Sequence, residues 1–312
     1  MKQKARDFFV IVLFLILLPY VLGIMNKTKT EGFTWMNMEK IKEEEEAVHF
    51  VKYEDKLSVQ EIPLEEFLIG ALATTINVEY DLEVLKAQAV LLRSTYYTKL
   101  QKQGTVSGQN IDRNIIGWEK VSNGYLTQSQ MKKIWKENYE ENYKKVVSAV
   151  EETKGIIITY EEQPIEGIYH AMSSGKTRNA KEVFVQNEYT YLESVLCEKN
   201  VESQEFLQSV AISKEILNTL IIEQRDTAGY VISLICNGEK ITGEQFRKKY
   251  ELASANFTFT EKENEFIIET KGSGHGLGMD QYYGNYLAEN EYSYTKILDY
   301  FFKDTKLSKM KE

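Results

Sequence analysis

The sequence predicts an α+β domain, with helices mainly in the first half and antiparallel strands and hairpins mainly in the second. Hydrophobic residues make up 43% of the chain, which is enough to build a core. A strand-like run, Tyr230–Cys236, ends at Asn237-Gly238, a strong hairpin signal. Upstream, apolar residues recur at helical spacing. These are Leu82, Leu85, Ala89, Leu92 and Tyr96.

Composition excludes several classes of protein. The 312 residues include 38 Lys+Arg and 47 Asp+Glu, a net charge of −9, which argues against a non-specific nucleic-acid binder. Two cysteines, Cys197 and Cys236, exclude a disulfide framework and any cysteine-rich zinc module. One disulfide or two unpaired thiols both fit the sequence.

The amino terminus predicts a membrane anchor. Three basic residues precede a largely apolar run from Phe8 to Met25, just long enough to cross a bilayer as a helix. A cleavable signal peptide is the alternative, but no small-residue cleavage site follows. We therefore expect residues 1–26 to form a cytoplasmic tail and a single-pass anchor in the cell membrane. Because basic residues stay in the cytoplasm, the rest of the chain should be extracytoplasmic.

An acidic stalk and one folded domain should follow the anchor. Residues 27–47 include the charge run Glu39–Glu46, typical of a solvated linker, and residues 48–312 form the domain. Two short strands are expected at its start, Val48–Tyr53 and Leu57–Gln60.

The first half of the domain should be mainly helical. Pro63, at a first helical position, opens a helix over Leu64–Ala73, and Asp81 is the expected N-cap of a second helix. A polar, glycine-containing stretch from about Gln101 to Gly124 predicts a long loop. Capping-box spacing at Thr127 and Gln130 starts a helix to Trp135. Another covers about Glu140–Thr153.

Hairpins dominate afterwards. Ile156–Tyr160 and Ile165–Tyr169 are expected to pair across Glu161–Pro164, and Glu265–Glu269 is a further strand.

Three segments contain polar residues and glycines that core packing alone would not require. They are Ile62–Arg93, Tyr169–Thr177 and Gly272–Gly284. The second runs from His170 into a Ser-Ser-Gly turn, which offers hydroxyls and backbone N–H groups to an oxygen-rich ligand. In the third, glycines flank His275 on both sides and allow close approach of a ligand or another segment.

These segments resemble the stage II sporulation protein D family, which includes amidase-enhancer proteins of bacterial cell walls. The family motifs are V-P-L-E-x-Y-L-x-G, L-K-A-Q-A-V, Y-H-S-x-S-G-G-K-T and G-H-G-V-G-M-S-Q-Y-G. Here they read Ile62–Gly70, Leu85–Val90, Tyr169–Thr177 and Gly274–Gly284. The resemblance covers roughly residues 57–305 and implies a membrane-anchored lytic transglycosylase. Its substrate would be peptidoglycan strands stripped of stem peptides, cut during engulfment of the forespore.

One departure affects the implied chemistry. Thr75 stands where the family has its proposed catalytic Glu, and a hydroxyl cannot act as a general acid near neutral pH. Glu79 and Asp280, the latter in place of a family serine, are the candidate substitutes. Ser174 replaces the first glycine of the family's S-G-G turn. Relatives that hold zinc use cysteines near the histidine, and residues 170–188 contain none, so we expect no metal and no cofactor.

The retained polar residues predict a sugar-binding groove that would supply hydrogen bonds and an aromatic face. They are Lys86, Gln88, Arg93, His170, Ser173, Ser174, Lys176, His275, Gln281 and Tyr282. We favour a cell-wall binding protein that has lost catalysis. The alternatives are an active lytic transglycosylase with a relocated acid and an unrelated extracellular domain. The implied partners are glycan strands, the membrane, a cell-wall amidase and sporulation membrane proteins, with no nucleic acid.

Overall fold

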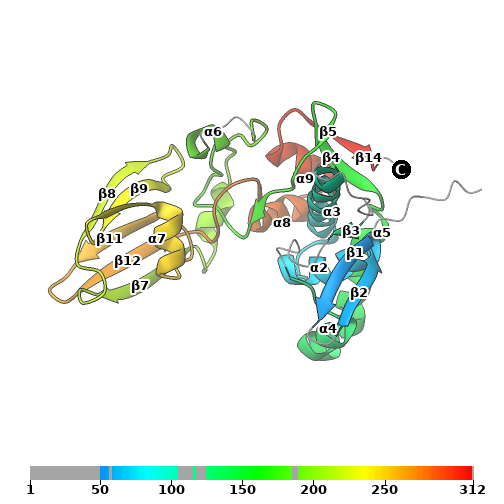
Figure 1. Cartoon of the computed structure of the whole chain (residues 1–312), viewed down its shortest axis with the longest axis horizontal. Coiled ribbons are helices and arrows are strands. Elements are labelled where there is room, and N and C mark those ends of the chain that lie inside the picture. Colours follow the sequence, from blue (N-terminus) through cyan, green and yellow to red (C-terminus); the bar gives the residue numbers. More distant parts are fainter. Residues whose placement is uncertain (1–49, 56–57, 105–114, 117–123, 185–188, 311–312) are drawn as a thin grey trace, which may run out of the picture. The chain divides into compact units, whose positions relative to one another are not determined.

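The computed structural model describes residues 50–55, 58–104, 115–116, 124–184 and 189–310. These belong to a compact unit, Val48–Lys311 (Figure 1). The expected anchor and stalk, residues 1–47, lie outside the described residues. Within the described part, no helix has both the length and the apolar character that a bilayer span requires.

The predicted distribution of helices and strands is confirmed. The helices that come first are α2 (Leu64–Thr75), α3 (Leu82–Gly104), α4 (Gln128–Trp135) and α5 (Tyr139–Glu151), with a 3-10 turn at Lys136–Asn138. Before them, β1 (Phe50–Asp55) and β2 (Ser58–Pro63) pair antiparallel, and β3 (Ile115–Ile116) joins β1 in parallel.

Local signals set the ends of these helices. Pro63 is the N-cap of α2 rather than its first helical residue, because it also ends β2. The Asp81 carboxylate accepts a hydrogen bond from the Glu83 amide at the start of α3. Thr127 and Gln130 form the predicted capping box of α4.

The hairpin after α5 is shorter than predicted. β4 (Ile156–Tyr160) turns at Glu161 and Glu162, both with positive φ, and pairs with β5, which is only Gln163–Pro164. The expected return strand, Ile165–Tyr169, is wrong in extent. Its last residue belongs instead to β6 (Tyr169–His170), which pairs in parallel with β13 (Met279–Asp280).

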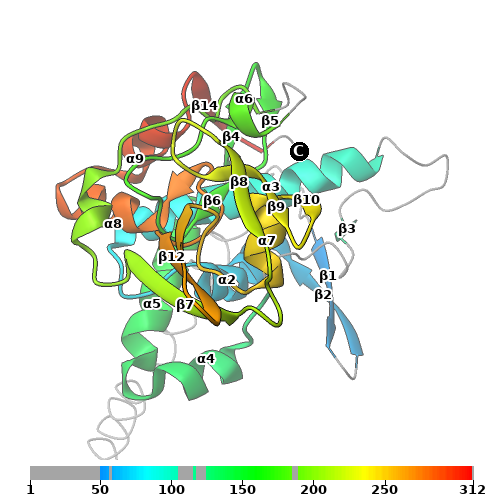
Figure 2. The same cartoon turned by 90° about the vertical axis from the view of Figure 1, so that its left-hand side faces the viewer.

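A large core forms around α3, which is buried along most of its length. α2, α5, α8 (Gln281–Glu289), α9 (Tyr294–Phe301) and the sheet of β4 with β14 (Thr305–Lys309) pack around it (Figure 2). Each fully buried Leu or Phe contributes about 1.5–3 kcal/mol by leaving water, so this core accounts for much of the folding energy.

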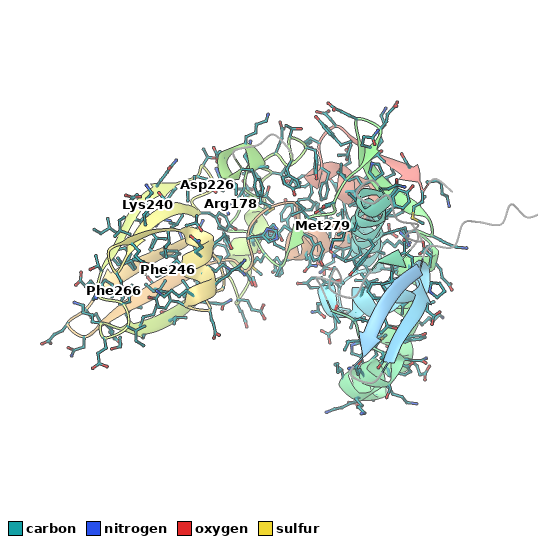
Figure 3. The ribbon with its side chains drawn as sticks, in the orientation of Figure 1. Arg178, Asp226, Lys240, Phe246, Phe266 and Met279 are labelled. Atoms are coloured by element: carbon teal, nitrogen blue, oxygen red, sulfur yellow. The ribbon has the colours of Figure 1, made fainter. Side chains whose placement is uncertain are left out.

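A second core lies in residues 207–271, between the two histidine segments in sequence. Phe246 and Phe266 are fully buried in it (Figure 3). Two three-stranded antiparallel sheets, in the orders β10-β9-β8 and β11-β12-β7, surround it with α7. The elements are β7 (Leu207–Ser213), β8 (Leu220–Arg225), β9 (Val231–Cys236), β10 (Glu239–Thr242), α7 (Gly243–Lys249), β11 (Phe257–Glu261) and β12 (Glu265–Lys271).

The predicted Asn237-Gly238 hairpin is confirmed, with both residues at positive φ between β9 and β10. The two cysteines are free thiols in different cores, so the disulfide that the sequence left open is not formed.

Candidate functional site

The second and third sequence motifs lie side by side. β6 and β13 pair in parallel, with Tyr169 opposite Met279 and His170 opposite Asp280. A separate antiparallel bridge joins Met172 and Ser273, which exchange backbone hydrogen bonds. This places the two histidine loops, more than 100 residues apart in sequence, against each other.

Glycines are required for this approach. A Cβ on Gly278 would lie 2.0 Å from the carbonyl oxygen of Ile168, and one on Gly274 would lie 2.8 Å from the Cβ of His170. Both glycines also have positive φ, which is costly for residues with side chains. The glycines around His275 therefore fit a backbone packed against β6.

The first motif reaches the same place at the end of α2. The Gln281 side-chain amide donates to the Thr75 carbonyl at 2.6 Å and to Gln88 Oε1 at 3.1 Å. Burial raises the pKa of the Tyr169 hydroxyl, and the nearby side chains of Thr75 and Gln88 oppose this rise. Thr75, Gln88 and Gln281 thus form one cluster, drawn from α2, α3 and α8.

Thr75 itself is half-buried, and its hydroxyl donates to the Leu72 carbonyl within α2 at 3.3 Å. None of its hydrogen bonds within the described part of the chain involves a carboxyl group. Glu79 lies on an exposed turn, where its amide bonds to Asn77 and its carbonyl accepts from Lys145. Neither contact joins Glu79 to the Thr75 cluster.

Asp280 is fully buried, and N–H groups surround its carboxylate. Oδ2 accepts from the Ser173 amide at 2.7 Å and from the Asn200 side-chain amide, and Oδ1 accepts from the Tyr283 amide at 2.9 Å. The last bond makes Asp280 the N-cap of α8. With three donors directed at its two oxygens, Asp280 holds the serine turn and the start of α8 in place.

His170 is buried and has one nitrogen without a hydrogen bond. Nδ1 lies 2.9 Å from the Leu277 carbonyl oxygen, which can only accept, so Nδ1 carries the proton. Nε2 lies 3.8 Å from Asp280 Oδ2 and has no hydrogen-bond partner among the described residues. Burial lowers the pKa of His170, although the Asp280 charge opposes this. The neutral ring therefore offers an acceptor at Nε2.

His275 is held differently. Its Nδ1 accepts from the Leu277 amide at 3.1 Å. Its ring lies 5.7 Å from that of His170. Burial, then the neighbouring His170 and two arginines, lower the pKa of His275 to about 3. His275 is thus a neutral residue that links the two loops.

The turn at Ser173 and Ser174 forms hydrogen bonds to two different parts of the fold. The Ser173 hydroxyl accepts from Asn200 at 3.0 Å, on the side of the large core. Ser174 donates its amide to the Tyr230 hydroxyl at 3.2 Å, and its own hydroxyl accepts from Asn256 at 2.8 Å. Lys176, next in the motif, is half-buried and makes no ion pair with a described residue. Tyr282 follows Gln281 and donates its amide to the Ala171 carbonyl.

Two residues of α3 that were predicted to line the groove form ion pairs with neighbouring helices instead. Lys86 forms ion pairs with Glu83 at 2.6 Å and Glu152 at 2.7 Å. Arg93 is fully buried and makes a two-pronged pair with Glu65 at 2.8 and 2.7 Å. These contacts join α3 to α2 and α5.

A buried ion pair that the sequence did not predict supports both loops. Arg178 and Asp226 lie next to each other (Figure 3), with Arg178 Nε 2.5 Å from Asp226 Oδ2 and the guanidinium over the Tyr230 ring. Arg178 also donates its amide to the Gly276 carbonyl and Nη1 to the His275 carbonyl. The partners are 48 positions apart, so no local pattern could have identified them.

Metal ligands are not grouped here. No cluster of three His, Cys, Asp or Glu residues suited to a metal occurs among the residues that the structure describes. Burial raises the pKa of the nearby Cys197 thiol well above its usual range, which keeps it protonated.

Comparison with known proteins shows which family this chain resembles. The sequence model of the family described as "Stage II sporulation protein" matches residues 52–160. Stage II sporulation protein D of Bacillus amyloliquefaciens is 34% identical over 263 residues, and that of Bacillus subtilis is 30% identical over 266 residues. Each match covers 80% of this chain and 76% of the relative.

An uncharacterised protein of Brachyspira hyodysenteriae is 26% identical over 300 residues, covering 91% of this chain and 76% of that protein. With the motifs in order and identity of at least 30% across most of both Bacillus proteins, the chain belongs to the stage II sporulation protein D family.

Proposed function

We propose that this protein binds peptide-free peptidoglycan strands outside the cell membrane during sporulation, and that it has lost the family's cleavage chemistry. The sporulation role comes from the Bacillus relatives, whose names state it. The proposed groove lies around Thr75, Gln88 and Gln281 and extends to the loops of His170 and His275. The expected N-terminal anchor would hold the protein at the membrane surface.

The proposal rests mainly on the polar side chains that cluster around Thr75. Residues from all three motifs meet there and present side-chain amides and a tyrosine hydroxyl, and His170, next to Tyr169 in the chain, has an unpartnered imidazole nitrogen. Such groups suit the hydroxyl and acetamido groups of a sugar chain. A lytic transglycosylase also needs a carboxyl group to protonate the glycosidic oxygen, and Thr75 cannot supply one.

The alternative is an active enzyme that uses Asp280 or Glu79. Asp280 accepts three hydrogen bonds and is buried, while Glu79 is exposed on a turn. An acid needs both a raised pKa and access to the glycosidic oxygen. We therefore rank the binding function above the enzymatic one.

The decisive experiment incubates the purified full chain with denuded glycan strands and looks for anhydro-muramyl ends by mass spectrometry. We expect none from the wild type and some from Thr75→Glu, because the half-buried site would raise the pKa of the new carboxyl group. Cleavage by the wild type that disappears in Asp280→Asn or Glu79→Gln would establish the alternative.

Binding is measured on the same material by co-sedimentation. His170→Gln should weaken pelleting because it replaces the unpartnered Nε2 in a residue of similar size. Lys248→Ala, an exposed position on α7, is the matched control. Equal pelleting of wild type and His170→Gln, with both folded, would remove His170 from the groove.

A further inference from the structure

The second core has an edge strand that lacks the usual protection against pairing. β7 hydrogen bonds to β12 on one side, and Figure 1 shows it at the margin of that sheet. Its seven residues, Leu-Gln-Ser-Val-Ala-Ile-Ser, include no charge and no proline, and its register with β12 runs without a bulge. Natural sheets normally block a free edge with one of these devices.

Two of the other edge strands in this core are blocked, and the third, β11, is shorter than β7 and ends at the charged Glu261. β8 contains register shifts and the charged residues Glu223 and Arg225. β10 is four residues long and includes Glu239 and Lys240. β7 therefore differs from its neighbours in length, charge and regularity.

The backbone groups of β7 that point outward can be identified from the ladder. Gly272 donates to the Phe206 carbonyl and Lys214 donates to the Asn264 carbonyl, so the even-numbered residues face β12. Leu207, Ser209 and Ala211 consequently direct their N–H and C=O groups to the free edge. Among the described residues, no backbone partner of these three lies on that side.

The side chains beside this edge are exposed. Leu207 is 63% exposed and Val210 is 36% exposed, which is unusual for apolar residues in a strand. Val210 lies on the same face as the buried Ile212, so an added strand with an apolar residue there would extend the second core.

Charge indicates what the other face of an added strand should carry. On the outer face, Leu207, Ser209 and Ser213 lie opposite Lys271, Glu269 and Glu265 of β12. Glu265 already pairs with Lys262 at 3.6 Å, whereas Glu269 has no ion pair with a described residue, so Glu269 is the charge that an added strand would meet. A strand beyond β7 would be about 10 Å from β12, and the small serine and alanine side chains leave room for a long basic side chain to reach across.

We propose that β7 accepts an extended segment of a partner protein as an additional antiparallel strand. That segment alternates apolar residues on the inner face with Lys or Arg on the outer face. A second copy of this chain fits less well, because β7 has no charged residue and would bring no basic side chain to meet Glu269. The proposal is independent of glycan binding.

The probe is a synthetic peptide, acetyl-Thr-Val-Lys-Val-Lys-Val-Thr-amide, with its binding to the full chain measured by fluorescence polarisation. In the proposed register the lysine amides face β7 and the central valine amides face away. A peptide N-methylated at both lysines should therefore not bind. A peptide of equal charge, N-methylated at the two valines that follow them, should bind as well as the unmodified one.

Protein variants test the same edge. Ala211→Pro removes an outward N–H while leaving the β12 ladder intact, and should weaken binding at least tenfold. Glu269→Gln should weaken it severalfold at low salt and less at high salt. No binding up to millimolar peptide, equal binding of the two methylated peptides, or unchanged binding by Ala211→Pro would overturn the proposal. So would a wild-type dimer that Ala211→Pro dissociates, because a second copy would then occupy the edge.

Discussion

Arg93 on α3 and His170 on β6 come from two motifs of the same family, yet their surroundings differ. Both are buried. The Arg93 guanidinium binds Glu65, the Thr153 hydroxyl and the carbonyls of Val150 and Ile156. His170 uses only Nδ1 and leaves Nε2 without a partner among the described residues.

The difference separates a residue whose polar atoms are all used within the fold from one that keeps an unused acceptor. A buried polar atom without a partner costs free energy, typically about 1–3 kcal/mol, so its persistence suggests that something else uses it. Arg93 has no such atom left, whereas His170 has one. The resemblance alone assigned both residues to a groove.

Removing Arg93 should have the largest effect on stability. Arg93→Met leaves Glu65 and two carbonyls without their donor, and breaking a buried pair costs about 3–5 kcal/mol. Chemical denaturation of the full chain measures the change. Lys240→Met, which removes an exposed pair with Glu223, is the matched control and should leave stability nearly unchanged. If both variants are equally stable, Arg93 is not the structural residue that its contacts indicate.

Substitution of Asp280 should cause the second-largest loss of stability. Asp280→Ala removes the N-cap of α8 and orphans the buried amides of Ser173 and Asn200, for an expected loss of about 2–4 kcal/mol. Asp280→Asn keeps an acceptor and should lose less. A catalytic acid would show the opposite pattern, with full stability in both variants and lost cleavage. Denaturation and glycan cleavage measured on the same samples distinguish the two roles.

Local signals in the sequence predicted much of this fold. Thr127 and Gln130 marked the start of α4, and Asn237-Gly238 marked the β9–β10 turn, because caps and tight turns depend on neighbouring residues. The parallel pairing of β6 with β13 was not predictable. Each strand is two residues long, and the partners lie more than 100 positions apart.

The same distinction holds for the site. His170 and His275 stood out because glycines and serines surround them in sequence. Asn200 and Arg178 did not, since Asn200 reaches Asp280 across 80 positions and Arg178 reaches Asp226 across 48. Sequence motifs therefore identified the residues of the loops but not those that support them.

The histidines should make the stability of the folded protein depend on pH. The pKa of His275 is lowered to about 3 in the folded protein, against about 6.5 unfolded. Above pH 6.5 the ring is neutral in both states and contributes nothing. As the pH falls toward 3, only the unfolded state gains the proton, so the folded state loses stability, by about 2 kcal/mol at pH 5.

His275→Gln should remove that part of the acid sensitivity. Denaturation midpoints at pH 7 and pH 5 would then lie closer together in the variant than in the wild type. His170, whose pKa is also lowered, acts in the same direction and should leave a residual dependence. An unchanged difference between the two pH values would mean that His275 is protonated in the folded protein.

Substitution of Lys86 should have the smallest effect on stability. It also tests most closely whether residues with satisfied contacts are purely structural. Burial lowers the pKa of Lys86, but hydrogen bonds to Glu152 and Glu83 outweigh burial and raise it, as expected for an ammonium held by two carboxylates. Glu152 is 52% exposed, so solvent screens the pair, and Lys86→Met should cost about 1 kcal/mol or less, decreasing with salt. Glycan pelleting should be unchanged if these ion pairs are its whole role. Weaker pelleting at unchanged stability would place Lys86 beside the sugar. In that case, a side chain whose hydrogen bonds are all satisfied within the fold could still bind glycan, and the contrast between Arg93 and His170 would not separate structural residues from binding residues.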